Sequence, residues 1–126
     1  MRLKLFDKQG KLLSENFYWM GNKYRDYTAL QNLPKITDLA ISKPIISKAE
    51  NGQELLTCTI ANTFTKTPAV GIRVQLLDNK GAQILPAIFN DGYFTLMPGE
   101  KKVLQVEVDS RLLKNGYHIS AKAFND

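Results

Sequence analysis

The residues that could do chemistry in this chain are few and scattered. There is one histidine, His118, and one cysteine, Cys58. Catalysis of the Ser-His-Asp or Cys-His kind needs a base oriented beside the nucleophile, but His118 alternates with Ser120 on the polar side of a predicted strand. Cys58 lies in LLTCTIA, where a small buried thiol is the usual interpretation. The sequence therefore predicts no nucleophilic centre.

Metal, cofactor and glycosidase sites are not predicted either. One histidine and one cysteine do not supply the several ligands that a zinc site needs, and neither GxGxxG nor GxxxxGK[ST] is present. Glycosidase chemistry needs two carboxyl groups about 5 to 10 Å apart across a cleft. Most of the twelve acids stand at turns or alternate outward on predicted strands. We expect no catalytic residue, no cofactor and no metal.

The positive charge of the chain is dispersed. The formal net charge is +5, but lysines and arginines occur singly or in pairs from Arg2 to Lys122. Nucleic-acid sites gather basic residues on one face or arm, so no nucleic-acid partner is predicted. No stretch approaches the roughly 18 to 20 consecutive apolar residues of a membrane span, and MRLKLFDKQGK lacks the features of a signal peptide. We therefore expect no membrane partner.

Turn signals at short intervals separate segments with the two-residue polarity period of half-buried strands. In QELLTCTIAN, Leu56, Cys58 and Ile60 share one face and the threonines share the other. The same period marks residues 71–78, 101–109 and 117–124. Further strands are predicted at 35–47, 82–88 and 93–96, and short helices at 24–32 and 110–114. Pro44 is expected at a sheet edge or a bulge, because proline cannot donate to a central ladder.

Strands with one apolar face must pack in two layers, which predicts an all-β, immunoglobulin-like antiparallel β-sandwich. Such a unit needs about 100 residues, so residues 35–126 nearly suffice alone. In residues 1–34, RLKLF and KLLSENFYW predict a β-hairpin, and the stretch that follows has no strand period. We predict a sandwich domain at 35–126 and an N-terminal hairpin and extended attachment at 1–34.

An aromatic group in the attachment is the first candidate binding site. It contains Phe17, Tyr18, Trp19, Tyr24 and Tyr27. Exposed aromatic rings stack on sugar rings, and they also anchor contacts between proteins or domains. Their concentration in the attachment favours packing against a neighbouring domain, with a sugar platform as the alternative.

The stretch NDGYFTLMPGEKK, residues 90–102, is the second candidate. The letters MPGE fit a type II turn, in which Gly99 takes the positive φ that other residues resist. In the short strand before it, Tyr93 shares a face with Thr95. We expect the stretch to be mainly a fold device, with Asp91 and Tyr93 as the residues to test for a ligand contact.

A family resemblance is carried by five segments: SENFYW (14–19), DYTALQNLPK (26–35), IANTFTKTPAVGIRVQLLD (60–78), ILP (84–86) and NDGYFTLMPGEKK (90–102). In this order they resemble the C-terminal immunoglobulin-like domain of glycoside hydrolase family 2 enzymes of the exo-β-D-glucosaminidase and β-mannosidase type. The chain departs from the family at Gly92, which stands where asparagine is usual, and at Gly71, which stands where a bulky residue is common.

The resemblance implies a non-catalytic accessory domain of an O-glycosyl hydrolase. In such enzymes the two catalytic glutamates lie in a (β/α)₈ barrel, which no stretch here resembles, so the isolated chain is not expected to be an enzyme. Residues 35–126 would match the last sandwich and residues 1–19 the closing hairpin of the domain before it. The implied partners are the other domains of a secreted or periplasmic hydrolase. The alternative is a carbohydrate-binding module that holds oligosaccharide through exposed aromatic residues: Tyr18, Trp19, Tyr24, Tyr27 or Tyr93.

Overall fold

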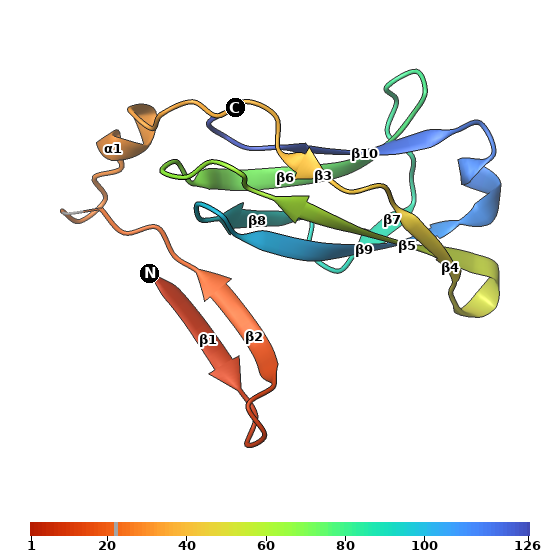
Figure 1. The fold of residues 1–126 in the computed structure, drawn as a ribbon, viewed down its shortest axis with the longest axis horizontal. Coiled ribbons are helices and arrows are strands. Elements are labelled where there is room, and N and C mark those ends of the chain that lie inside the picture. The colour runs from red at the N-terminus through yellow and green to blue at the C-terminus, as the bar shows by residue number, and fades with distance from the viewer. Residues whose placement is uncertain (22) are drawn as a thin grey trace. The chain divides into compact units, whose positions relative to one another are not determined.

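The computed structural model describes residues 1–21 and 23–126, and it contains two compact units, Met1–Pro34 and Lys35–Asp126 (Figure 1). Antiparallel strands dominate, which confirms the predicted all-β class. Among the residues described, no helix has the length and apolar character needed to cross a bilayer.

The first unit is a β-hairpin followed by one helical turn. Strand β1 (Arg2–Phe6) pairs antiparallel with β2 (Leu12–Phe17). The turn between them is closed by Asp7, whose carboxylate accepts hydrogen bonds from the backbone N–H groups of Gln9 and Lys11, both at 2.8 Å. This is the hairpin that the sequence predicts.

The helix of this unit, α1 (Thr28–Gln31), is much shorter than the predicted range of 24–32. Arg25 has a φ of +61°, in the left-handed region, so a right-handed helix cannot include it. At the other end, Pro34 disfavours helical backbone in the residue before it. These two constraints confine the helix to the residues between Arg25 and Leu33, where the structure has one turn.

The second unit is a two-layer antiparallel sandwich. Its strands are β3 (Ala40–Ile41), β4 (Ile45–Lys48), β5 (Gln53–Ala61), β6 (Ala69–Asp78), β7 (Ala87–Phe89), β8 (Tyr93–Leu96), β9 (Lys101–Asp109) and β10 (Tyr117–Lys122). The larger sheet has the order β3-β5-β9-β7, with β4 also paired to β5, and the smaller sheet has the order β10-β6-β8. Two 3₁₀ turns, η1 (Glu50–Gly52) and η2 (Ser110–Leu113), connect strands.

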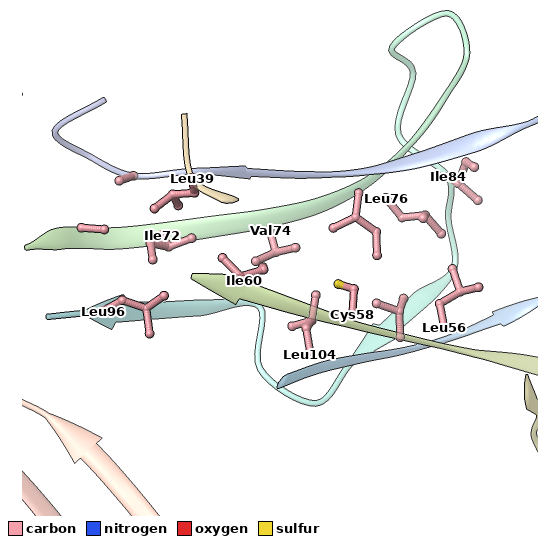
Figure 2. Close-up of a cluster of buried hydrophobic side chains, with 14 of the residues drawn as sticks. Leu39, Leu56, Cys58, Ile60, Ile72, Val74, Leu76, Ile84, Leu96 and Leu104 are labelled. Atoms are coloured by element: carbon pink, nitrogen blue, oxygen red, sulfur yellow. The ribbon is translucent and has the colours of Figure 1, made fainter. Parts of the chain in front are cut away.

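The core lies between the two sheets, and Figure 2 shows side chains of both pointing into it. The period predicted for β5 is confirmed, because Leu56, Cys58 and Ile60 are at most 2% exposed. On β6, Ile72 and Leu76 are fully buried in the same way. Since a fully buried leucine or isoleucine stabilises by about 1.5 to 3 kcal/mol, these alternating positions hold the layers together.

The predicted strand at 35–47 is interrupted. The chain forms β3 and β4 as separate short strands, with Pro44 between them, and both pair with the same outer side of β5. Pro44 therefore lies at a sheet edge, as predicted, and it breaks the strand because it has no N–H to donate.

The predicted strand at 82–88 is wrong as a single element. Gln83 makes an isolated bridge to Leu77 of the smaller sheet, whereas β7 pairs with β9 of the larger sheet. The segment crosses from one layer to the other between these two contacts. Pro86 lies in the crossing, where the missing N–H costs no ladder hydrogen bond.

The predicted helix at 110–114 is the 3₁₀ turn η2. The carboxylate of Asp109 accepts a hydrogen bond from the N–H of Arg111 at 2.9 Å and so caps the turn. Hydrogen bonds from the Arg111 side chain and backbone lower the pKa of Asp109 to about 2.

A buried asparagine, Asn62, ties the end of β5 to the end of β8. Only 1% of Asn62 is exposed, and its side-chain amide donates to the carbonyl oxygens of Thr67 at 2.9 Å and Leu96 at 3.1 Å. Its Oδ1 accepts from the N–H of Phe64 at 3.1 Å. One side chain thus satisfies three backbone groups at this end of the sandwich.

A second buried asparagine, Asn125, holds the other end of the same loop. Its Oδ1 accepts from the N–H of Val70 at 3.0 Å, and its amide donates to the carbonyl of Pro68 at 3.0 Å. Its own carbonyl accepts from the N–H of Ile36 at 2.9 Å. The loop between β5 and β6 is therefore fastened at both ends by buried amides.

The turn after β8 is also fastened to Asn62. The Glu100 N–H donates to the Met97 carbonyl at 3.0 Å, and Gly99 has a φ of +76°, as expected for the predicted type II turn. The backbone N–H of Asn62 donates to the Glu100 carbonyl at 2.9 Å, and its carbonyl accepts from Gly99 at 3.0 Å.

Replacing Asn62 by leucine should lower the free energy of unfolding by about 3 kcal/mol. The apolar side chain leaves the buried carbonyl of Leu96 without its donor, and each such orphaned group costs about 1 to 3 kcal/mol. Urea denaturation followed by circular dichroism measures the loss. A loss below about 1 kcal/mol would show that water replaces the amide without cost.

Replacing Gly99 by valine should destabilise the sandwich by about 1 kcal/mol or more, because a β-branched residue resists positive φ. The matched control is Gly92→Ala, since an added Cβ there would meet only the Phe89 side chain, at ordinary contact distances of 3.8 and 4.0 Å. Thermal denaturation compares the two variants. Equal melting temperatures for Gly99→Val and the unmodified chain would contradict the turn assignment.

Candidate functional site

The residues with intrinsic reactivity are not assembled into a catalytic centre in the part of the chain described. His118 is exposed on the outer face of β10 and lines a shallow depression of about 200 Å³ together with Asp38 and Asp126. Cys58 is buried, and this burial raises the pKa of its thiol, which keeps it protonated and unreactive. No group of three or more histidine, cysteine or acidic side chains within residues 1–21 and 23–126 is placed to hold a metal ion.

The aromatic residues of the first unit are only partly brought together. The ring centroids of Phe17 and Trp19 lie 5.0 Å apart, with the ring planes tilted by 53°. Tyr24 is 89% exposed, and the guanidinium of Arg25 lies 5.0 Å from its ring centroid. Tyr18 and Tyr27 are exposed as well, at 47% and 50%. These rings form a loose series along the segment that follows β2.

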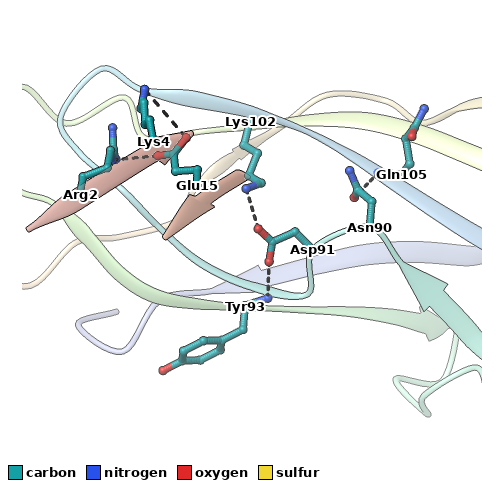
Figure 3. Close-up of polar contacts among 8 residues, drawn as sticks. All are labelled: Arg2, Lys4, Glu15, Asn90, Asp91, Tyr93, Lys102 and Gln105. Atoms are coloured by element: carbon teal, nitrogen blue, oxygen red, sulfur yellow. Dashed lines mark hydrogen bonds and ion pairs between the residues drawn. The ribbon is translucent and has the colours of Figure 1, made fainter. Parts of the chain in front are cut away.

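The two faces of the β1–β2 hairpin differ in character. On one face the Arg2 guanidinium pairs with the Glu15 carboxylate at 2.9 Å, and Lys4 lies 3.9 Å from the same carboxylate (Figure 3). On the other face Leu3 and Leu5 are 51% and 60% exposed. Their paired positions on β2 are polar, so nothing within the hairpin covers these leucines.

The Asp91 carboxylate is occupied by structural contacts. Its Oδ2 lies 2.6 Å from the Lys102 Nζ, and its Oδ1 accepts from the N–H of Tyr93 at 3.3 Å (Figure 3). Next to it, Asn90 exchanges two hydrogen bonds with the backbone of Gln105, at 2.9 and 3.0 Å. These contacts fix the loop between β7 and β8 against β9.

Tyr93 points away from the Asp91 carboxylate (Figure 3), so the two predicted site residues do not converge on one ligand position. The Tyr93 side chain is 69% exposed on the outer face of the smaller sheet, opposite Arg73 of β6. Phe124 is also exposed, at 67%. It was missed as a candidate, although the alternation of YHISAKAF already sets Phe124 on the same side as Lys122.

The outer face of the larger sheet carries aliphatic residues where polar ones are usual. Directly paired residues share a face, and Glu107 of β9 pairs with Leu55 on one side and Ile88 on the other. Ile45 and Val103 point outward on the same side, opposite threonines of β5. We call these four residues, Ile45, Leu55, Ile88 and Val103, the aliphatic face.

The aliphatic face is exposed over three of its members. The side chains of Ile45, Ile88 and Val103 are 71%, 62% and 56% exposed. Leu55 and Ile88 also line a depression of about 120 Å³ with Glu107. Sequence reasoning missed this surface, because alternation within one strand does not show that four neighbouring strands each place an aliphatic residue outward.

Comparison with protein families gives one matching model over most of the chain. Residues 16–126 match the model described as the exo-beta-D-glucosaminidase Ig-fold domain. An exo-beta-D-glucosaminidase of Hypocrea jecorina is 33% identical over 127 residues, and one of Streptomyces avermitilis is 30% identical over 122 residues. These alignments cover 86% and 83% of this chain but 14% of each relative. The chain therefore spans about one seventh of the length of these relatives.

The fold is also found in a solved structure. The crystal structure of the Amycolatopsis orientalis exo-chitosanase CsxA superimposes with a TM-score of 0.79 over 95% of this chain and 16% of that one, at 24% identity. The likeness confirms the immunoglobulin-like sandwich predicted from the strand pattern.

Replacing Asp91 by asparagine should lower the free energy of unfolding by less than about 1 kcal/mol, because partly exposed ion pairs contribute little. The asparagine oxygen still accepts from the Tyr93 N–H. Asp91→Ala loses this hydrogen bond as well and should be the more destabilising of the two. Urea denaturation of both variants checks the order; equal losses would assign the whole effect to the pair with Lys102.

Proposed function

Because this chain belongs to the exo-beta-D-glucosaminidase Ig-fold domain family, we propose that it is a non-catalytic accessory domain that packs against other domains of a larger glycoside hydrolase. The observation that carries the proposal is the aliphatic face. Aliphatic side chains that point outward from four adjacent strands, three of them exposed, are typical of a surface that another protein surface covers.

The physical basis for packing is the removal of this surface from water. Each square ångström of apolar surface that is buried stabilises by roughly 25 cal/mol, so covering three largely exposed aliphatic side chains stabilises the assembly by several kcal/mol. Glu107 lies between Leu55 and Ile88, and no ion pair of Glu107 occurs within the described part of the chain. A covering domain with a lysine or arginine at this point would complement it.

The hairpin supports the proposal independently. A two-stranded hairpin is marginally stable by itself in water, and Leu3 and Leu5 need a covering surface outside it. We propose that residues 1–19 complete the sheet of a preceding domain and that the rest of residues 1–34 links it to the sandwich at 35–126. The exposed aromatic rings of Tyr18, Trp19 and Tyr24 are interdomain anchors in this arrangement.

In this proposal, catalysis is carried out by other domains of the longer parent polypeptide. The relatives are named exo-beta-D-glucosaminidases, and the chain spans a small part of them, so the parent's activity toward glucosamine-containing glycans is part of the proposal. The domain shapes the active-site entrance only if one of its loops reaches that far.

Lysine substitutions on the aliphatic face test the proposal. Ile88→Lys and Val103→Lys should change the stability of the isolated chain by less than about 0.5 kcal/mol, because both sites are exposed there. In the full-length parent the same lysines are buried: Val103→Lys lies opposite Thr59 and has no acid there, whereas Ile88→Lys lies opposite Glu107. The melting temperature of the parent should therefore fall by several degrees in calorimetry.

His118→Lys, on the outer face of the other sheet, is the matched control and should leave the full-length protein unchanged. An unchanged melting temperature for full-length Ile88→Lys and Val103→Lys would reject the proposed packing. The proposal would also be rejected if light scattering shows that the isolated chain is a dimer and either lysine substitution makes it a monomer. A second copy of the chain, and not another domain, would then cover the aliphatic face.

A further inference from the structure

An aromatic and cationic surface lies on the outer face of the smaller sheet, away from the aliphatic face. Arg73 of β6 pairs with Tyr93 of β8 on one side and with Lys122 of β10 on the other. Paired residues of antiparallel strands share a face, so the three side chains form one row across the sheet. Phe124 follows the same alternation two residues after Lys122. Packing through the aliphatic face leaves this row uncovered.

A glycine without a side chain makes room for the Tyr93 ring. Gly71 has a φ of +56° and lies where the register of β6 against β8 shifts between Ala69 and Ile72. A Cβ on Gly71 would lie 2.6 Å from the Tyr93 hydroxyl oxygen and 3.2 Å from its Cζ. Any side chain at this position would displace the end of the ring.

The ring is also fixed from its backbone side. The Tyr93 N–H donates to Asp91, and the Gly71 N–H donates to Thr95 Oγ1 at 3.2 Å, which holds the bulge against β8. The Phe124 Cβ is also close, because it would be 3.7 Å from the same missing Cβ. Two aromatic residues, each about two-thirds exposed, therefore lie beside one glycine. We call Tyr93, Phe124 and Gly71 the aromatic platform.

The positive charges beside the platform favour a ligand that carries a carboxylate. Arg73 is exposed next to Tyr93, and neither Arg73 nor Lys122 forms an ion pair within the residues that the structure describes. A guanidinium binds a carboxylate through two parallel hydrogen bonds. An exposed aromatic ring offers its face to an apolar ring face. A pyranose ring that carries a carboxylate matches both groups.

We propose that the aromatic platform binds an acidic saccharide, with the sugar ring stacked on Tyr93 and its carboxylate paired with Arg73. A protonated amino sugar is disfavoured there, because its ammonium group would lie within a few ångströms of two cations. This binding goes beyond the accessory role and does not depend on which domain covers the aliphatic face.

A titration followed by NMR tests the proposal with three probes: trigalacturonate, the neutral cellotriose and the fully deacetylated glucosamine trimer. Trigalacturonate should bind saturably at concentrations up to about 10 mM and shift the amide signals of Gly71, Tyr93 and Phe124. Cellotriose should bind about tenfold more weakly, and the glucosamine trimer more weakly still.

Four variants assign the contacts. Tyr93→Ala should weaken trigalacturonate binding about tenfold, whereas Tyr93→Phe keeps the ring and should bind as the unmodified chain does. Arg73→Gln should reduce trigalacturonate binding to the level of cellotriose. Phe124→Ala should weaken the binding of both trigalacturonate and cellotriose. The exposed positions of these residues mean that the variants fold, and the unchanged remainder of the amide spectrum confirms it.

Three outcomes would overturn the proposal. The first is no saturation with trigalacturonate, and the second is equal binding of all three trimers. The third is binding that Tyr93→Ala leaves unchanged, which would place the saccharide elsewhere. If a peptide of glutamates shifts the same signals and trigalacturonate does not, the surface is a protein contact instead. None of these results bears on the lysine substitutions at Ile88 and Val103, so the two proposals fail separately.

Discussion

The sandwich depends on keeping the buried backbone groups of one loop satisfied. Between β5 of the larger sheet and β6 of the smaller one, the chain has carbonyl and N–H groups that bond to side chains in place of ladder partners. Asn62 and Asn125 supply these partners from the two ends of the loop. The bonds from Asn62 to the Leu96 carbonyl and from the Val70 N–H to Asn125 are buried, so these two operate without competition from water. The loop between β5 and β6 is thus a structural joint.

This joint determines how the two outer faces are presented. Asn62 joins β5 to β8, and Asn125 joins the end of the chain to β6, so strands of both layers are held at one end of the sandwich. The aliphatic face and the aromatic platform then lie on opposite layers. A single small domain can in this way pack against a neighbour with one surface while the other stays in contact with solvent.

The sequence predicted the elements whose information is local. The period of QELLTCTIAN placed Leu56 and Ile60 in the core, and MPGE placed the positive φ at Gly99, because strand faces and turns depend on neighbouring residues. The crossing at 82–88 was not predictable, since alternation shows which residues are buried but not which sheet they join. The candidate site divides in the same way: the alternation placed Tyr93 on one face with Thr95, whereas the space provided by Gly71 depends on a contact between different strands.

The bulge at Gly71 has a consequence for how such domains diverge. A family member with a bulky residue there keeps the same two layers and the same core, because the position faces outward, yet its tyrosine ring must be carried elsewhere or replaced. A single substitution at Gly71 can therefore change the shape of the outer face of this sheet. The hydrophobic core and the hydrogen bonds of Asn62 and Asn125 stay as they are. The shape of this outer face can therefore change without a change in the core beneath it.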